Sequence, residues 1–118
     1  QYLSEYLFAT DPTYANTALV FVRQRGPDGL FADVALDCMP QVAGWQPLGS
    51  SGKYEVARIM IAQNFQGVGG CHNGVHTATS PVPFGLTVWG YDQYASYAYP
   101  AGMSVEPINT VVIPPVPQ

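Results

Sequence analysis

The distribution of glycine and proline most strongly limits the folds open to this chain. Its 118 residues include 12 glycines and 11 prolines, and both are spread along the sequence. No window repeats apolar residues at the i, i+3, i+4 and i+7 spacing of an amphipathic helix for more than a turn or two. The sequence therefore predicts a protein almost without helices.

Short segments rich in aromatic and β-branched residues alternate with turn residues, which is typical of strands. The predicted strands cover residues 2–10, 17–24, 30–36, 54–63, 75–80, 84–91, 96–99 and 110–113. Pro27 and Gly29 predict that the second and third of these strands form a hairpin. The glycine-rich residues 66–74 predict a tight loop, because glycine weakens a strand.

Many short strands without crossover helices predict an all-β protein, an antiparallel β-sandwich of the jelly-roll or Ig-like kind. The length is that of one domain. We expect a single sandwich domain over residues 1–113, followed by a stiff Pro-rich tail over residues 114–118.

The chain has two cysteines, Cys38 and Cys71, and neither has a second cysteine or clustered histidines at metal-ligand spacing. A disulfide between them is the simplest prediction, and it indicates an oxidising compartment, hence a secreted or cell-surface protein. The alternative is a pair of buried free thiols in a cytosolic domain. The chain begins at Gln1 and not Met, which we interpret as a processed form or an excised segment.

The charge of the chain argues against several classes of partner. Charged residues make up 10% of the chain, and the net charge is −4. The positive residues are Arg23, Arg25, Lys53 and Arg58. They form no basic stripe for nucleic acid or for an anionic membrane. The sequence contains no run of 18 apolar residues, so it does not predict insertion into a membrane.

The candidate metal ligands are few. His72 and His76 lie beside Cys71, but Cys38 competes for Cys71 and no third independent ligand is evident. We interpret His76 as a hydrogen-bonding residue at the start of a strand. A calcium site on a carboxylate cluster is not supported by any EF-hand-like spacing. We therefore expect no metal and no cofactor.

Catalytic motifs are also missing. The sequence does not show any two of the carboxylates at a separation suited to acid and base catalysis. The four considered are Asp28, Asp33, Asp37 and Glu55. No G-x-S-x-G nucleophile motif, phosphate-binding loop or dinucleotide fingerprint is present. We predict that the protein is not an enzyme.

Residues 74–102 carry a set of spaced positions that resembles a known family. The matching positions are Gly74, His76, Ser80, Pro83, Phe84, Val88, Gly90, Tyr91, Ser96, Tyr97, Pro100 and Gly102. In this order they resemble the C-terminal part of the IgGFc-binding protein N-terminal domain family, with a weaker likeness over residues 54–61. The resemblance implies an extracellular β-rich module with binding or adhesive associations and no catalytic residues. Independently of this resemblance, the residues themselves predict that Gly90 lets the chain bend as it leaves the sheet.

An aromatic segment near the end of the chain is the predicted contact surface. Its rings are Trp89, Tyr91, Tyr94, Tyr97 and Tyr99. Tyrosine offers a large contact area at a small entropic cost, so these residues are predicted to bind a protein or glycan partner. The alternative is that the rings cap the core.

The predicted function is an extracellular adhesion or recognition module. The alternative is a structural subunit of a filament or surface assembly built by β-strand exchange, which would make the protein a homo-oligomer through its sheet edges. The aromatic N-terminal strand, residues 2–8, and the segment 109–117 would then be the exchanged elements. Light scattering distinguishes monomers from such assemblies.

Overall fold

The computed structural model describes residues 2–93 and 95–101, and these residues form eight β-strands and no helix. The strands are β1 (Leu3–Ala9), β2 (Asn16–Gln24), β3 (Ala35–Leu36), β4 (Gln46–Pro47), β5 (Tyr54–Gln63), β6 (Gln66–Gly67), β7 (Val75–Tyr91) and β8 (Ser96–Pro100). The prediction of an antiparallel all-β fold is confirmed. The predicted strand 110–113, the tail 114–118 and Tyr94 lie outside the described residues.

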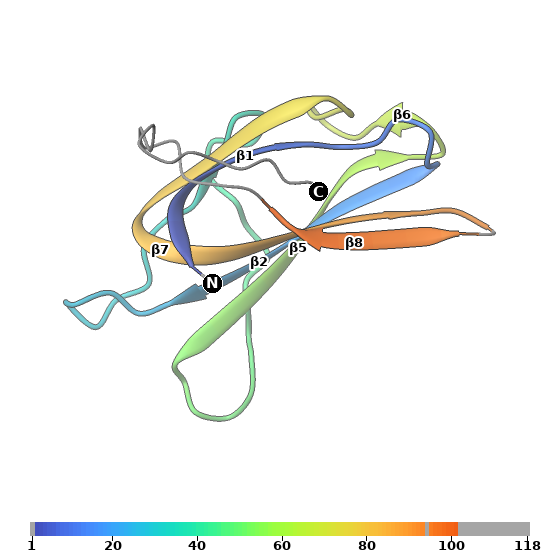
Figure 1. The fold of residues 1–118 in the computed structure, drawn as a ribbon. Helices are drawn as coiled ribbons and strands as arrows, with labels where there is room; N and C mark the ends of the chain where they lie inside the picture. The colour runs from blue at the N-terminus through green and yellow to red at the C-terminus, as the bar shows by residue number, and fades with distance from the viewer. Residues whose placement is uncertain (1, 94, 102–118) are drawn as a thin grey trace, which may run out of the picture.

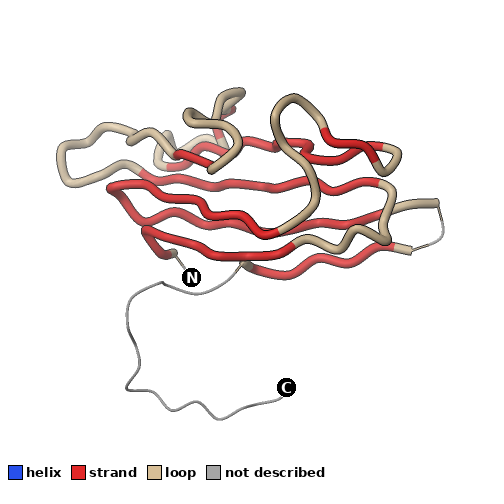
Figure 2. Tube along the Cα trace, turned by 90° about the horizontal axis from the view of Figure 1, so that it is seen from above, coloured by secondary structure: helices blue, strands red, loops and turns tan. Residues whose placement is uncertain are grey.

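All eight strands belong to one antiparallel sheet, with the order β1-β7-β2-β5-β4 along its main path. β3 and β8 pair with β7, and β6 pairs with β5. β7 curves strongly, so that β1 lies along its first half and β2 and β5 continue the sheet from its second half (Figure 1). The strands run side by side, with the loops at their ends (Figure 2).

The core lies on the concave face of β7. Every second residue of this 17-residue strand is buried, from His76 to Gly90, with the single exception of the half-buried Val82. One face therefore points inward over the whole length of the strand. The most deeply buried apolar side chains come from β2, β3, β5, β7 and the loop after Gly29: Leu19, Phe21, Val34, Leu36, Ile61, Phe84 and Val88.

The sequence predicted two strands where the structure has the single strand β7. Pro81 and Pro83 suggested an interruption, since proline cannot donate to a ladder. The pairing of β1 with β7 does shift in register here, from the pair Glu5 and Thr79 to the pair Leu3 and Phe84. The two prolines thus lie in an irregular stretch where β7 bends without ending.

The predicted hairpin between residues 17–24 and 30–36 was wrong beyond its turn. The turn forms, with the Gly26 N–H donating to the Leu30 carbonyl at 2.8 Å and Gly29 at a φ of 81°. Only the bridge between Arg25 and Phe31 follows it. β2 cannot pair further with the returning chain because β5 occupies one of its edges and β7 the other.

The Cys38–Cys71 disulfide joins the connection between β3 and β4 to the connection between β6 and β7. Cys38 follows β3 and Cys71 precedes β7, and their Cα atoms are 5.1 Å apart. The predicted disulfide is therefore confirmed. The glycine-rich segment 66–74 was predicted to be a loop throughout, but its first two residues form β6 (Gln66–Gly67), which pairs with β5. The chain after them turns tightly, since a Cβ at Gly67 would overlap the backbone carbonyl of Cys71.

Candidate functional site

The aromatic segment forms a β-hairpin of β7 and β8 in the structure, and not a loop. Tyr97 pairs with Gly90 and Tyr99 pairs with Val88, both of which face the core side. Trp89 and Tyr91 alternate with them and point to the outer face of the sheet. The hairpin therefore divides the predicted contact residues between two faces.

A groove of about 490 Å³ lies on the outer face of this sheet. We call it the outer groove, and its lining residues are Val20, Arg58, Trp89, Tyr91 and Ser96. They come from β2, β5, β7 and β8. Val20 is the cross-strand neighbour of Arg58, so the register of β2 against β5 places the guanidinium beside an apolar wall.

The chemistry of the outer groove is mainly apolar with one positive charge. Trp89 is 41% exposed and Arg58 is also exposed. The Arg58 guanidinium donates to the Tyr91 hydroxyl at 3.2 Å, and this hydroxyl lies 3.7 Å from the sulfur of Met60. Within residues 2–93 and 95–101, Arg58 makes no ion pair with a carboxylate. Its charge is therefore available to a ligand.

Tyr97 and Tyr99 pack beside the C-terminal end of β1. The Tyr97 ring lies over Gly90 and packs edge-on against Tyr14 at a centroid distance of 4.7 Å. Its hydroxyl accepts a hydrogen bond from the Asp11 N–H at 3.1 Å, and the Tyr99 hydroxyl donates to the Ala9 carbonyl. Burial raises the pKa of both phenols. Both rings also line a second hollow, of about 400 Å³, with Ala9, Thr10 and Asp11.

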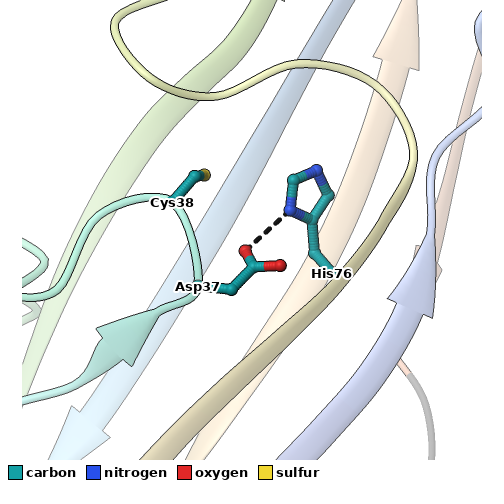
Figure 3. Close-up of side chains that lie close together, drawn as sticks. All are labelled: Asp37, Cys38 and His76. Atoms are coloured by element: carbon teal, nitrogen blue, oxygen red, sulfur yellow. Dashed lines mark hydrogen bonds and ion pairs between the residues drawn. The ribbon is translucent and has the colours of Figure 1, made fainter.

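A polar cluster lies at the disulfide. The carboxylate of Asp37 and the ring of His76 point toward one another, and Cys38 lies beside Asp37 on the loop after β3 (Figure 3). The His76 Nδ1 is 2.7 Å from the Asp37 Oδ1, and its Nε2 is 2.6 Å from the His72 carbonyl oxygen. His76 is 3% exposed and occupies the second position of β7, which agrees with the interpretation of a hydrogen-bonding residue at a strand start.

The other carboxylates considered above have separate local partners. Asp28 accepts from the Leu30 N–H at 2.9 Å as a turn residue, and Asp33 accepts from Gln41 at 3.3 Å. Glu55 forms an ion pair with Arg23 at 2.6 Å. These contacts give each carboxylate a local structural role.

Sequence reasoning missed Arg58 and Val20 as groove residues and Asp37 as the partner of His76. Arg58 was counted only as a positive charge, and Asp37 only as a loop residue beside Cys38. In each case the residues that come together are far apart in the sequence. Their proximity follows from the pairing of the strands, which the sequence alone did not predict. The alternation of Trp89 and Tyr91 along one strand was the only local signal.

The fold and the sites together define a disulfide-linked β-module, without helices in its described residues, that has an exposed groove on its sheet. None of the described residues forms a helix long and apolar enough to span a membrane. The chain belongs to the family described as IgGFc binding protein, whose model matches residues 1–90. This match confirms the family and covers the start of the chain as well. It ends at residue 90, so the motif positions after it, from Tyr91 to Gly102, lie outside the match. Searches of curated proteins and of solved structures returned no match.

Family membership supports two general statements about the protein. The family is one of binding domains, so binding is its general role. The family and the disulfide together indicate an extracellular location.

Proposed function

We propose that this protein is a secreted or cell-surface, non-catalytic recognition module that binds a protein partner through the outer groove. The observation that carries the proposal is the cluster of the exposed Trp89 and Arg58 with the half-buried Tyr91. These are the three residue types most enriched among the residues that dominate binding energy at protein interfaces. The predicted binding role of Trp89 and Tyr91 is thus kept, with Arg58 added.

The composition of the groove favours a particular kind of contact. Val20 and Trp89 offer apolar area, and the Arg58 guanidinium offers charge-assisted hydrogen bonds to a carboxylate. We expect the partner to insert an acidic side chain next to an apolar or aromatic one. A carboxylate on Arg58 would be partly desolvated by Trp89, which strengthens the pair.

The Fc fragment of immunoglobulin G is the first protein to test, because the matching family is described as IgGFc binding protein. Binding of Fc to the 118-residue chain is measured by surface plasmon resonance. We expect Trp89→Ala to weaken binding by at least about 2 kcal/mol, a factor of about 30, as typical for a dominant interface residue. Arg58→Met keeps an unbranched apolar stem and removes the charge, so it should slow association at low salt.

Leu30→Ala is the matched control, since Leu30 is 63% exposed on a loop outside the groove. Equal binding by folded Trp89→Ala and wild-type protein would remove the groove from the proposal. Because glycans were the other predicted ligand class, a glycan array is run in parallel. Binding to glycans through Trp89, with no protein bound, would overturn the choice of a protein partner.

The structural subunit stays a second candidate, because one edge of the sheet is open. Among the described residues β1 pairs only with β7, so its other edge can accept a strand. Glu5 lies on this edge strand and opposes such pairing. Multi-angle light scattering should find monomers if recognition is the function, and large assemblies if strand exchange is.

A further inference from the structure

We propose that reduction of the Cys38–Cys71 disulfide opens a zinc site formed by Cys38, Cys71, His76 and Asp37. In the oxidised protein both sulfurs are bonded to each other, so neither is a thiolate ligand. The ligand atoms of Asp37, Cys38 and His76 nevertheless lie within 4.8 Å of one another. Cys71 lies outside this group, but its sulfur is bonded to that of Cys38, so after reduction it is close enough to Cys38 to move in as the fourth ligand.

The ring of His76 is already held as a zinc-ligating ring is held. Its Nε2 can only donate to the His72 carbonyl, which fixes the proton on Nε2 and leaves Nδ1 toward Asp37 and Cys38. A metal-bound histidine usually donates its second ring nitrogen to a carbonyl or carboxylate in this way. The ring is 3% exposed, so its orientation is maintained by packing.

The facing atoms of His76 and Asp37 are both of kinds that bind zinc. The imidazole Nδ1 lies 2.7 Å from a carboxylate oxygen of Asp37, while Nε2 is directed to the His72 carbonyl. A zinc ion between Nδ1 and the carboxylate would bind both atoms, with thiolates completing its coordination.

The distance between the ligand atoms of His76 and Asp37 is close to that in a zinc site. Zinc bonds of about 2.0–2.2 Å to nitrogen and oxygen in a tetrahedron place those two atoms about 3.3 Å apart. The observed 2.7 Å therefore needs to widen by only about 0.6 Å, within a rotation of the Asp37 side chain on its loop. Two sulfurs, one imidazole and one carboxylate suit zinc better than calcium or magnesium.

The opening step balances with a dithiol as reductant. The dithiol gives two electrons and two protons to the disulfide, which becomes two thiols, while the dithiol itself becomes a cyclic disulfide. Binding of Zn²⁺ then displaces the two thiol protons to solvent. Oxidation reverses the sequence and releases the metal.

Two single variants give a matched test without any reductant, because each removes the disulfide and leaves one thiol. Cys71→Ser keeps Cys38, whose sulfur is within 4.8 Å of the ligand atoms of His76 and Asp37, whereas Cys38→Ser keeps Cys71, which lies outside that group. Titration of the full chain with Co²⁺ as the spectroscopic probe should give sulfur-to-metal charge-transfer absorbance in Cys71→Ser. We expect at least tenfold weaker binding in Cys38→Ser, and loss of the absorbance when Zn²⁺ is added to Cys71→Ser.

His76→Gln in the Cys71→Ser background should weaken Co²⁺ binding by tenfold or more. Equal binding by Cys38→Ser and Cys71→Ser, or an unchanged affinity in the His76→Gln variant, would overturn the proposal. If either single variant is unfolded by circular dichroism, the dithiol-reduced wild type is titrated instead. Zn²⁺ should raise its melting temperature and leave that of the oxidised protein unchanged, and the absence of this difference would also refute the site.

Discussion

Gly90 is the residue of β7 on which the packing of β8 depends most directly. It lies within β7 and pairs with Thr17 on one side and with Tyr97 on the other. The Tyr97 ring covers the space where a side chain would stand. The predicted role of Gly90, a bend where the chain leaves the sheet, was wrong, because the strand continues through it and its lack of a side chain makes room for the ring.

We therefore predict that Gly90→Ala destabilises the protein by about 1–3 kcal/mol, the usual effect of overpacking. The added methyl group would overlap the Tyr97 ring and displace it from β7. Equilibrium urea denaturation measures the change. In a Tyr97→Ala background the same substitution should have a much smaller effect, and a loss of equal size in both backgrounds would contradict the proposed clash.

At the scale of the elements, the β7–β8 hairpin has two different faces. Trp89 and Tyr91 belong to the outer groove, while Tyr97 and Tyr99 lie against the end of β1. The proposed binding residues therefore lie on one face of the hairpin, and the tyrosines that pack against β1 lie on the other. A variant on the outer face is expected to alter binding without loosening β8.

The inner tyrosines should make the protein sensitive to alkali. Burial raises the pKa of Tyr97 and of Tyr99 above the ordinary value of 10.0. The unfolded chain therefore loses these protons first, so the contribution of the two phenols to the free energy of unfolding is constant below about pH 10 and is lost as the pH rises through the folded pKa. Urea denaturation from pH 8 to 11 checks this.

Replacing both residues in the variant Tyr97→Phe/Tyr99→Phe should reduce the slope of that decline. A remainder is expected, since burial also raises the pKa of Tyr2 and Tyr6. An unchanged slope in the double variant would show that these two phenols are not the source.

Local patterning predicted the elements better than it predicted their partners. The alternation and β-branched content of residues 54–63 predicted β5 with its observed bounds, and the predicted β1, β2 and β8 agree with the observed strands to within a few residues. The pairing of β2 with β5 and β7, which excludes the expected hairpin, depends on contacts distant in sequence. The position of Arg58 in the groove depends on the same register, so no local pattern could predict it.

At the scale of the whole molecule, the disulfide adds a covalent link beside the pairing of β3 with the first part of β7. It closes a loop between residues separated by 33 positions. We predict that Cys38→Ala/Cys71→Ala lowers the free energy of unfolding by about 3–4 kcal/mol, from the chain entropy that the unfolded protein regains. Urea denaturation of the variant and of dithiol-reduced wild type should give similar losses. A loss below about 1 kcal/mol would contradict the prediction.

Because β7 pairs with β1, β2, β3 and β8, both halves of the sheet share one central strand. Neither half can separate from the other without breaking the ladders of that strand. The backbone amides of β1 and of β2 should therefore exchange with deuterium through the same opening event and at nearly the same free energy. Mechanical force that a bound partner applies to the β7–β8 hairpin would therefore be spread over the entire sheet.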